Sequence, residues 1–189
     1  MALTFKLVET NEDLQATARM AHDIWFEYWP ALIGKAQTEY MVANMQSLSA
    51  ITRDIRQVGY RYWILLDEQG KRVGYTSALV EDFSDDPMCA EATKHGTEIA
   101  KRASKRLFIS KIYLFASERG KHYASRVLEF YEKLCHDEGL EAMYLTVNRG
   151  NDLAIRAYLG RGFDIIEEVA ADIGSGFVMD DHIMCKMVG

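Results

Sequence analysis

Proline and cysteine are scarce in this chain, which has two prolines and three cysteines among its 189 residues. The cysteines Cys89, Cys135 and Cys185 show no CxxC spacing, which argues against a disulfide framework and against a structural zinc site. The five histidines form no HExxH or HxxxH set, so we predict no catalytic metal. Reduced thiols of this kind indicate a cytoplasmic protein.

The chain also lacks a basic excess and a long apolar run. Its 28 acidic and 22 basic residues give a net charge of −6, which disfavours a nucleic-acid partner and mildly favours a cationic one. The most apolar segment carries Lys111 in its middle, and the first residues have no signal-peptide core. We therefore expect neither membrane insertion nor export.

The composition is that of an ordinary globular protein. Hydrophobic residues make up 49% and charged residues 26% of the chain, and no repeat or low-complexity linker interrupts it. We therefore predict one domain over residues 1–189.

The first third of the chain has the periodicity of helices. Apolar residues at spacings of three and four from Leu14 to Tyr28 predict an amphipathic helix, which Pro30 should end. Gly34 should open a second helix, and a third is expected over Ser49–Gln57 with Gly59 as its stop.

Strands and helices alternate in the remainder. A strand pair over Tyr60–Leu66 and Val73–Val80 should precede a polar loop with a short helix over Glu91–Lys101. The later part of the chain predicts a strand over Leu107–Phe115, a helix from His122, a strand over Met143–Val147, a helix after Asn151, and a hairpin of Phe163–Val169 and Phe177–Met187. This order of elements predicts a mixed sheet with helices on both faces.

The junction between the strand ending at Phe115 and the next helix is a candidate anion site. The first turn of a helix offers free N–H groups and the positive end of the helix dipole, which suit a phosphate. Arg119 and Lys121 add charge, while Gly120 and Ala124 keep the approach open. A plain solvated turn is the alternative. Neither GxxxxGK[ST] nor GxGxxG occurs, so an NTPase or a dinucleotide enzyme is not expected.

A second candidate site lies on the following helix. Asn151 and Tyr158 are seven residues apart, which is two helical turns, so both lie on one face. Considered alone, the pair is explained by a helix N-cap and a core tyrosine.

Together the two sites resemble the GNAT (Gcn5-related N-acetyltransferase) superfamily. The resemblance rests on a strand, RGKxxA, a helix, a strand and NxxAxxxYxxxGF, and it covers residues 105–188. IGKAQTEYM and GFVMDDHIMCK are similar to a bacterial subgroup that includes polyamine acetyltransferase-like proteins. The resemblance implies the α/β (α+β) GNAT fold, with a mixed, mostly antiparallel twisted sheet and helices on both faces.

The resemblance also implies acetyl-CoA as the acyl donor and assigns residues to it. The family's pyrophosphate loop corresponds to Arg119, Gly120, Lys121, His122, Tyr123 and Ala124. His122 replaces a glycine of the family pattern, and such a glycine lets backbone approach a diphosphate closely. The pantetheine arm is expected along Ile112, Tyr113 and Leu114 and beside Asn151.

The expected reaction is direct attack of an amine on the thioester. A lysine-like amine has a pKa of about 10.4 and must lose a proton first. The resemblance makes Tyr158 the general acid for the departing thiolate, with a backbone N–H near Tyr113 as the oxyanion donor. Glu81 and Asp82 are candidate bases because they follow a strand, with a solvated loop as the alternative. Asp180 and Asp181 lie on the final strand, where adjacent residues point to opposite faces, so at most one faces the cleft, with a surface role in the hairpin as the alternative.

The function expected from these residues is N-acetyl transfer from acetyl-CoA to a primary amine of a small molecule, for which a polyamine is one candidate. The alternative from another class is a catalytically silent acyl-CoA-binding sensor or assembly module. A non-binding domain with a degenerate loop is a third interpretation, supported by His122 alone. The family also implies a homodimer.

Overall fold

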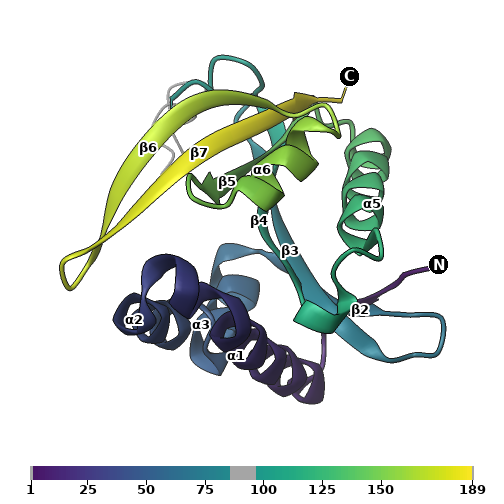
Figure 1. Cartoon of the computed structure of the whole chain (residues 1–189). Coiled ribbons are helices and arrows are strands. Elements are labelled where there is room, and N and C mark those ends of the chain that lie inside the picture. The colour runs from purple at the N-terminus through teal and green to yellow at the C-terminus, as the bar shows by residue number, and fades with distance from the viewer. Residues whose placement is uncertain (1, 86–96, 189) are drawn as a thin grey trace. The chain divides into compact units, whose positions relative to one another are not determined.

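The computed structural model describes residues 2–85 and 97–188. Hydrogen bonds order its seven strands as β1-β2-β3-β4-β5-β7-β6 (Figure 1). The strands are β1 Thr4–Leu7, β2 Arg61–Leu66, β3 Arg72–Asp82, β4 Lys105–Leu114, β5 Ala142–Asn148, β6 Asp164–Gly174 and β7 Phe177–Met187. The helices are α1 Asn11–Ile33, α2 Lys35–Met45, α3 Leu48–Arg53, α5 Tyr123–Glu138 and α6 Asp152–Leu159.

The sheet is mixed and mostly antiparallel, which confirms the predicted fold class. β4 and β5 run parallel, with pairs from Arg106↔Ala142 to Ile109↔Leu145. The β1–β2, β2–β3, β5–β7 and β6–β7 pairs are antiparallel. The chain forms two compact units, and both β3 and β4 pass from one unit into the other.

The first unit comprises Met1–Leu79 and Lys111–Val127. In it α1 packs its apolar face on the strands that carry Tyr62, Ile64 and Tyr75. A capping box of Thr10 and Asp13 starts α1, since the Thr10 side chain accepts from the Asp13 N–H and the Asp13 carboxylate accepts from the Thr10 N–H. The helices α1, α2 and α3 lie beside one another in this unit (Figure 1).

One helix end in this unit differs from the prediction, and another agrees with it. Pro30 was expected to end the first helix, but α1 continues through it to Ile33 and stops at Gly34, whose φ is +83°. A proline this near the end disturbs only the last turn, so the helix tolerates it. A π-helical turn, Asp54–Val58, follows α3 and ends at Gly59, as expected.

The strands also differ from expectation in two places. β3 runs to Asp82, so Glu81 lies within a strand and not in the polar loop. β1 was not predicted, because four residues on the edge of a sheet, paired with β2 alone, carry little pattern. The helix expected over Glu91–Lys101 falls mainly outside the described residues, and its described end forms turns.

The second unit comprises Val80–Ser110 and Leu128–Gly189. Its core contains Tyr131, Cys135 and Tyr144, which are all fully buried. The long β6–β7 hairpin turns at Ser175 (Figure 1). Lys186 of β7 forms an ion pair with Glu132 of α5, so this position of β7 faces the helix.

Gly74 of β3 leaves no room for a side chain beside β4. A Cβ at this position would lie 2.1 Å from the Tyr113 carbonyl oxygen and 3.0 Å from the Leu114 Cα. Because both are backbone atoms of β4, neither can turn aside as a flexible side chain could.

We expect Gly74→Ala to destabilise the protein by about 1–3 kcal/mol, the usual cost of overpacking. The measurement is the free energy of unfolding in urea. Gly160→Ala is the control, because Gly160 has a helical φ of −64° and its nearest contact would be an ordinary 3.4 Å to the Arg156 carbonyl. Equal stability of the Gly74→Ala variant and the wild type would show that β4 shifts freely.

Candidate active site

The loop between β4 and α5 contains two residues in the left-handed region. Gly120 has a φ of +76° and His122 a φ of +62°. The left-handed conformation costs an L-residue about 1–2 kcal/mol, and glycine adopts it freely. His122 therefore adopts a backbone conformation natural to the glycine that the family pattern has at this position.

His122 also lies at the start of α5. Its carbonyl accepts the hydrogen bond from the Arg126 N–H at 3.2 Å. The N–H groups of Ala124 and Ser125 precede this bond, so they have no acceptor within the helix. The positive end of the helix dipole lies at the same place. The loop thus has the backbone features of an anion site.

Charged side chains accompany the helix start. Lys121 is exposed, and Arg119 is half-buried with its guanidinium 4.5 Å from the centre of the Tyr28 ring. Stacking of this kind holds a guanidinium in place and leaves N–H donors in its plane. Tyr123 is buried and anchors the first turn of α5.

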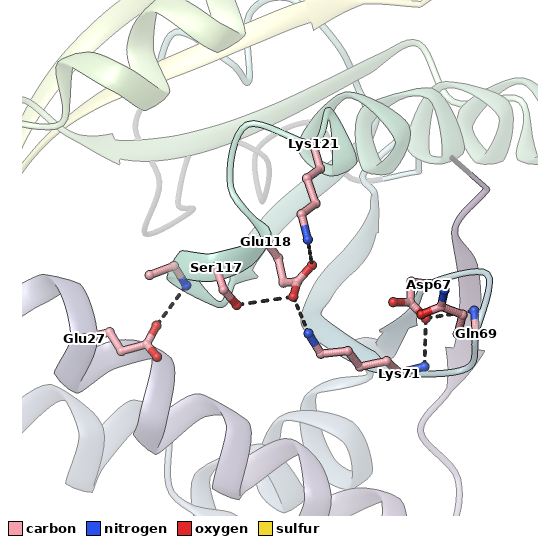
Figure 2. A network of polar contacts seen from close by, with 8 residues as sticks. Glu27, Asp67, Gln69, Lys71, Ser117, Glu118 and Lys121 are labelled. Carbon is pink, nitrogen blue, oxygen red and sulfur yellow. Dashed lines mark hydrogen bonds and ion pairs between the residues drawn. The ribbon is translucent and has the colours of Figure 1, made fainter.

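A buried carboxylate organises this loop from beneath. Glu118 is 1% exposed and accepts from Lys71 Nζ at 2.5 Å, from Lys121 Nζ at 2.8 Å and from Ser117 Oγ at 3.2 Å (Figure 2). Lys71 follows the β2–β3 turn, whose Asp67 accepts from the Lys71 N–H at 2.9 Å. Glu118 therefore ties the loop to the turn between two strands of the same unit.

The two lysines lower the pKa of Glu118 to about 2, since their hydrogen bonds and charges stabilise its ionised form. Glu118 in turn raises the pKa of Lys71. A second acid acts on the preceding turn, because Glu27 of α1 accepts from the Ala116 N–H at 2.9 Å (Figure 2). The loop is therefore positioned by carboxylates while it presents cations to solvent.

The strand segment Ile112–Leu114 leads into this loop. All three residues are half-buried, and the Tyr113 ring lies edge-on to Trp25, with 5.5 Å between the ring centres. The Phe115 N–H donates to the Val73 carbonyl at 3.1 Å. Packing and pairing thus hold the segment that the family resemblance assigns to pantetheine.

Lys111, directly before this segment, is a buried cation. Its Nζ lies 3.6 Å from an Asp54 carboxylate oxygen and 5.3 Å from the centre of the Tyr62 ring. Burial lowers the pKa of Lys111, and burial beside Asp54 raises that of Tyr62. The Tyr62 hydroxyl donates to Asp54 at 2.7 Å, so this cluster is closed internally.

The second predicted site lies in the other unit, on α6. The Asn151 side chain accepts from the Ala154 N–H at 3.3 Å, which makes it the helix N-cap. Tyr158 is half-buried and packs against Phe163 at 5.7 Å between ring centres. Desolvation raises the pKa of Tyr158 to about 12, and no described residue hydrogen-bonds its hydroxyl. The hydroxyl is thus kept protonated and is available as a donor.

Glu81 is placed quite differently from Tyr158. Its carboxylate accepts from Arg106 Nε at 2.8 Å and from the Tyr144 hydroxyl at 2.9 Å. Arg106 is fully buried and also donates to the Ala103 carbonyl at 3.0 Å. The Glu81 carboxylate thus already neutralises a buried charge, and its role as a proton acceptor remains a prediction.

The predicted residues fall into two groups, one in each unit. Ile112–Leu114 and Arg119–Ala124 belong to the first unit, and Glu81, Asn151 and Tyr158 belong to the second. Sequence reasoning missed the network of Glu118. An acid directly before Arg-Gly-Lys was the available signal, but Lys71 is 47 residues away along the chain.

Metal-ligating and membrane-spanning features are lacking in what the structure describes. Over residues 2–85 and 97–188, no three or more His, Cys, Asp or Glu side chains form a group that could hold a metal ion. Within the same ranges, no helix is both long enough and apolar enough to cross a membrane.

Comparison with known proteins found one matching family. The profile of the acetyltransferase (GNAT) family matches residues 18–163. A search of curated protein sequences found no match.

Solved structures share the fold at low identity. The PaiA N-acetyltransferase from Thermoplasma acidophilum, in complex with coenzyme A, is 15% identical with a TM-score of 0.69, over 99% of each chain. A GCN5-related N-acetyltransferase from Rhodopseudomonas palustris is 17% identical with a TM-score of 0.69, over 98% of this chain and 94% of that one. A chimera of the spermidine N-acetyltransferase SpeG from Vibrio cholerae and hSSAT is 16% identical with a TM-score of 0.64, over 100% and 96%.

The Glu118 network predicts a specific dependence of stability on pH. The folded-state pKa of about 2 lies below the ordinary 4.5, so this group stabilises the fold fully above about pH 4.5 and loses that contribution as the pH falls towards 2. Glu118→Gln cannot titrate. We expect the stability difference between wild type and variant, measured by urea unfolding, to be largest above pH 4.5 and to shrink in acid. A difference that stays constant with pH would contradict the network.

Proposed function

The chain belongs to the acetyltransferase (GNAT) family, and on that premise we propose that it transfers an acetyl group from acetyl-CoA to a primary amine of a small molecule. The observation that carries the proposal is the loop before α5. There His122 keeps a left-handed φ at the helix start, beside Arg119 and Lys121. A helix N-terminus with flanking cations suits a diphosphate.

The proposed donor site consists of the loop and the strand before it. Arg119, Gly120, Lys121, His122, Tyr123 and Ala124 would bind the pyrophosphate, and Ile112, Tyr113, Leu114 and Asn151 the pantetheine arm. The support for the loop is physical. Glu118 and Tyr28 already hold Lys121 and Arg119, so less side-chain entropy is lost when the anion binds.

The proposed reaction is a direct attack. The neutral amine nitrogen forms a bond to the thioester carbonyl carbon, the tetrahedral oxyanion collapses, and the carbon–sulfur bond breaks. The oxyanion is stabilised by a backbone N–H near Tyr113 in this proposal, and the departing thiolate takes a proton from Tyr158. The Tyr158 pKa of about 12 supports this role, because the hydroxyl still carries its proton at neutral pH.

The acceptor is proposed to be a cationic small molecule, with a polyamine as one candidate. The net charge of −6 supports a cationic ligand, whereas the structural likeness to a spermidine acetyltransferase chimera speaks for the fold alone. We also propose a bacterial, cytoplasmic protein. The buried thiols Cys135 and Cys185 suit a reducing compartment. The family homodimer remains a prediction, which a molar-mass measurement in solution would check.

Titration calorimetry with acetyl-CoA is the first test of the donor site. We expect Arg119→Ala to weaken acetyl-CoA binding by about 1.5–3 kcal/mol, the worth of a hydrogen bond to a charged group. Arg56→Ala, which removes an exposed arginine of the π-helical turn, controls for the loss of one positive charge. Equal affinity in wild type and Arg119→Ala would exclude Arg119 from the diphosphate site, and no binding by the wild type would refute the donor.

A second variant separates catalysis from binding. We expect Tyr158→Phe to lower kcat by about 10²-fold or more, while the affinity for acetyl-CoA stays the same, because the proton is needed only as the thiolate departs. Release of free thiol in the presence of spermidine measures kcat. Tyr131→Phe removes the hydroxyl of a buried tyrosine in the same unit and serves as the control. Tight acetyl-CoA binding with no turnover by the wild type would favour the silent binding module.

A further inference from the structure

Asp181 of β7 is a buried carboxylate in the second unit. It is 5% exposed, whereas its neighbour Asp180 is exposed and pairs with Arg149 at 3.2 Å. The two neighbouring side chains therefore differ in burial, as alternation along a strand requires. Asp181 lies opposite Asn148 of β5 and Val169 of β6 in the sheet, so uncharged residues flank it on both paired strands.

Asp181 lacks the partners that the other buried carboxylates have. Glu81 is paired with Arg106, and Glu118 is held by two lysines. Among residues 2–85 and 97–188, by contrast, no hydrogen bond or ion pair reaches the Asp181 side chain. The Asp181 carboxylate oxygens are not among the fully buried, unpartnered side-chain atoms of the described residues, so they keep some contact with solvent, from which a cation can reach them. A largely desolvated carboxylate that lacks a partner is typical of a functional site.

Asp181 belongs to the same unit as Asn151 and Tyr158, two residues of the proposed reaction. Its strand partner Asn148 ends β5, and three residues later Asn151 caps α6, which carries Tyr158. Lys186 faces the helices, because it pairs with Glu132 of α5 and lies 3.6 Å from where a Gly162 Cβ would be. Alternation along β7 then puts Asp181 on the opposite face of the strand.

On the basis of the proposed function, we propose that Asp181 binds the ammonium group of the acceptor amine and takes the proton that the amine must lose before attack. The ligand class is thus a primary alkylammonium ion. The ionised carboxylate attracts the ammonium ion, and the ammonium ion supplies the positive charge that the carboxylate lacks in the free protein.

The protons balance in this scheme. The ammonium ion gives one proton to the Asp181 carboxylate, and the neutral nitrogen then bonds to the carbonyl carbon. The adduct nitrogen loses its second proton as the carbon–sulfur bond breaks, and this replaces the proton that Tyr158 gave to the thiolate. Asp181 afterwards releases its proton to water, so each turnover yields an amide, a thiol and one proton.

The electrostatic surroundings support this role. Burial and the negative charge of Asp180 raise the pKa of Asp181 to about 6, which suits a base at neutral pH. The charged or titratable groups nearest to Asp181 along the sheet are Asp180 and His182 on β7, Glu167 and Glu168 on β6, and Arg149 after β5. His182 lies 3.6 Å from Glu168. The Glu167 carboxylate accepts a hydrogen bond from the Glu98 N–H at 2.9 Å. Arg149 forms ion pairs with Asp180 and Glu168.

The test compares Asp181→Asn with Asp180→Asn as the matched control. Four amines serve as acceptors with acetyl-CoA, namely spermidine, glucosamine, lysine and a short peptide with a free N-terminus, and thiol release is followed from pH 5 to 9. For the amine that the wild type acetylates, we expect Asp181→Asn to lower kcat/KM about 10²-fold and to abolish the fall in rate below about pH 6. Asp180→Asn should keep the rate at neutral pH and should keep this limb of the profile, moved to lower pH, because the charge that helps to raise the Asp181 pKa is removed.

Two further readouts separate this role from a structural one. Acetyl-CoA affinity should be the same in Asp181→Asn and wild type, and thermal stability should be equal or higher, because an unpartnered buried charge is removed. An active wild type with an Asp181→Asn variant of equal kcat/KM and unchanged pH profile would overturn the role of Asp181 and leave the proposed function standing. A destabilised variant would also overturn it. A wild type inactive on all four amines would refute the proposed function and this role with it.

Discussion

The buried guanidinium of Arg106 is the constraint on which the centre of the sheet depends. Arg106 comes from β4, its partner Glu81 from β3, and Tyr144, which donates to the same carboxylate oxygen, from β5. One charge pair thus connects three neighbouring strands. A shift of any of them by one residue would turn its side chain to the other face and leave a charge buried alone, so the pair specifies the register. This explains why Glu81 is in a strand.

The loop before α5 likewise depends on a buried carboxylate that is paired with cations. The left-handed backbone of His122 is unfavourable by itself and persists only because the surroundings determine it. Glu118, buried under the loop, joins Lys121 to the turn that carries Lys71. Glu81 and Glu118 therefore stabilise the fold through their partners. Asp181 differs from them, because no described residue forms a hydrogen bond or an ion pair with its side chain. That contrast is the basis for assigning Asp181 to a ligand.

Most of the order of elements follows from local signals, and each error has an identifiable physical cause. Gly59 ends a helical turn, as the sequence predicted, because a left-handed φ suits glycine. Gly34 was predicted to open the second helix, and in the structure it also ends α1. Pro30 was read as a stop and is not one, since its effect depends on how much helix remains beyond it. The charge of Glu81 suggested a loop, because the buried arginine that stabilises it is 25 residues away.

The sequence by itself determined the helix starts, the hairpins, the absence of cysteine and histidine metal motifs, and the motifs around Arg119, Asn151 and Tyr158. These depend on neighbours within a few residues, where propensity and periodicity act. Only the tertiary structure decided which acids are paired and which is not. Glu81, Glu118 and Asp181 look alike in sequence, but their roles depend on burial and on partners distant in the chain. Desolvation and charge pairing act through space, and so local pattern does not reveal them.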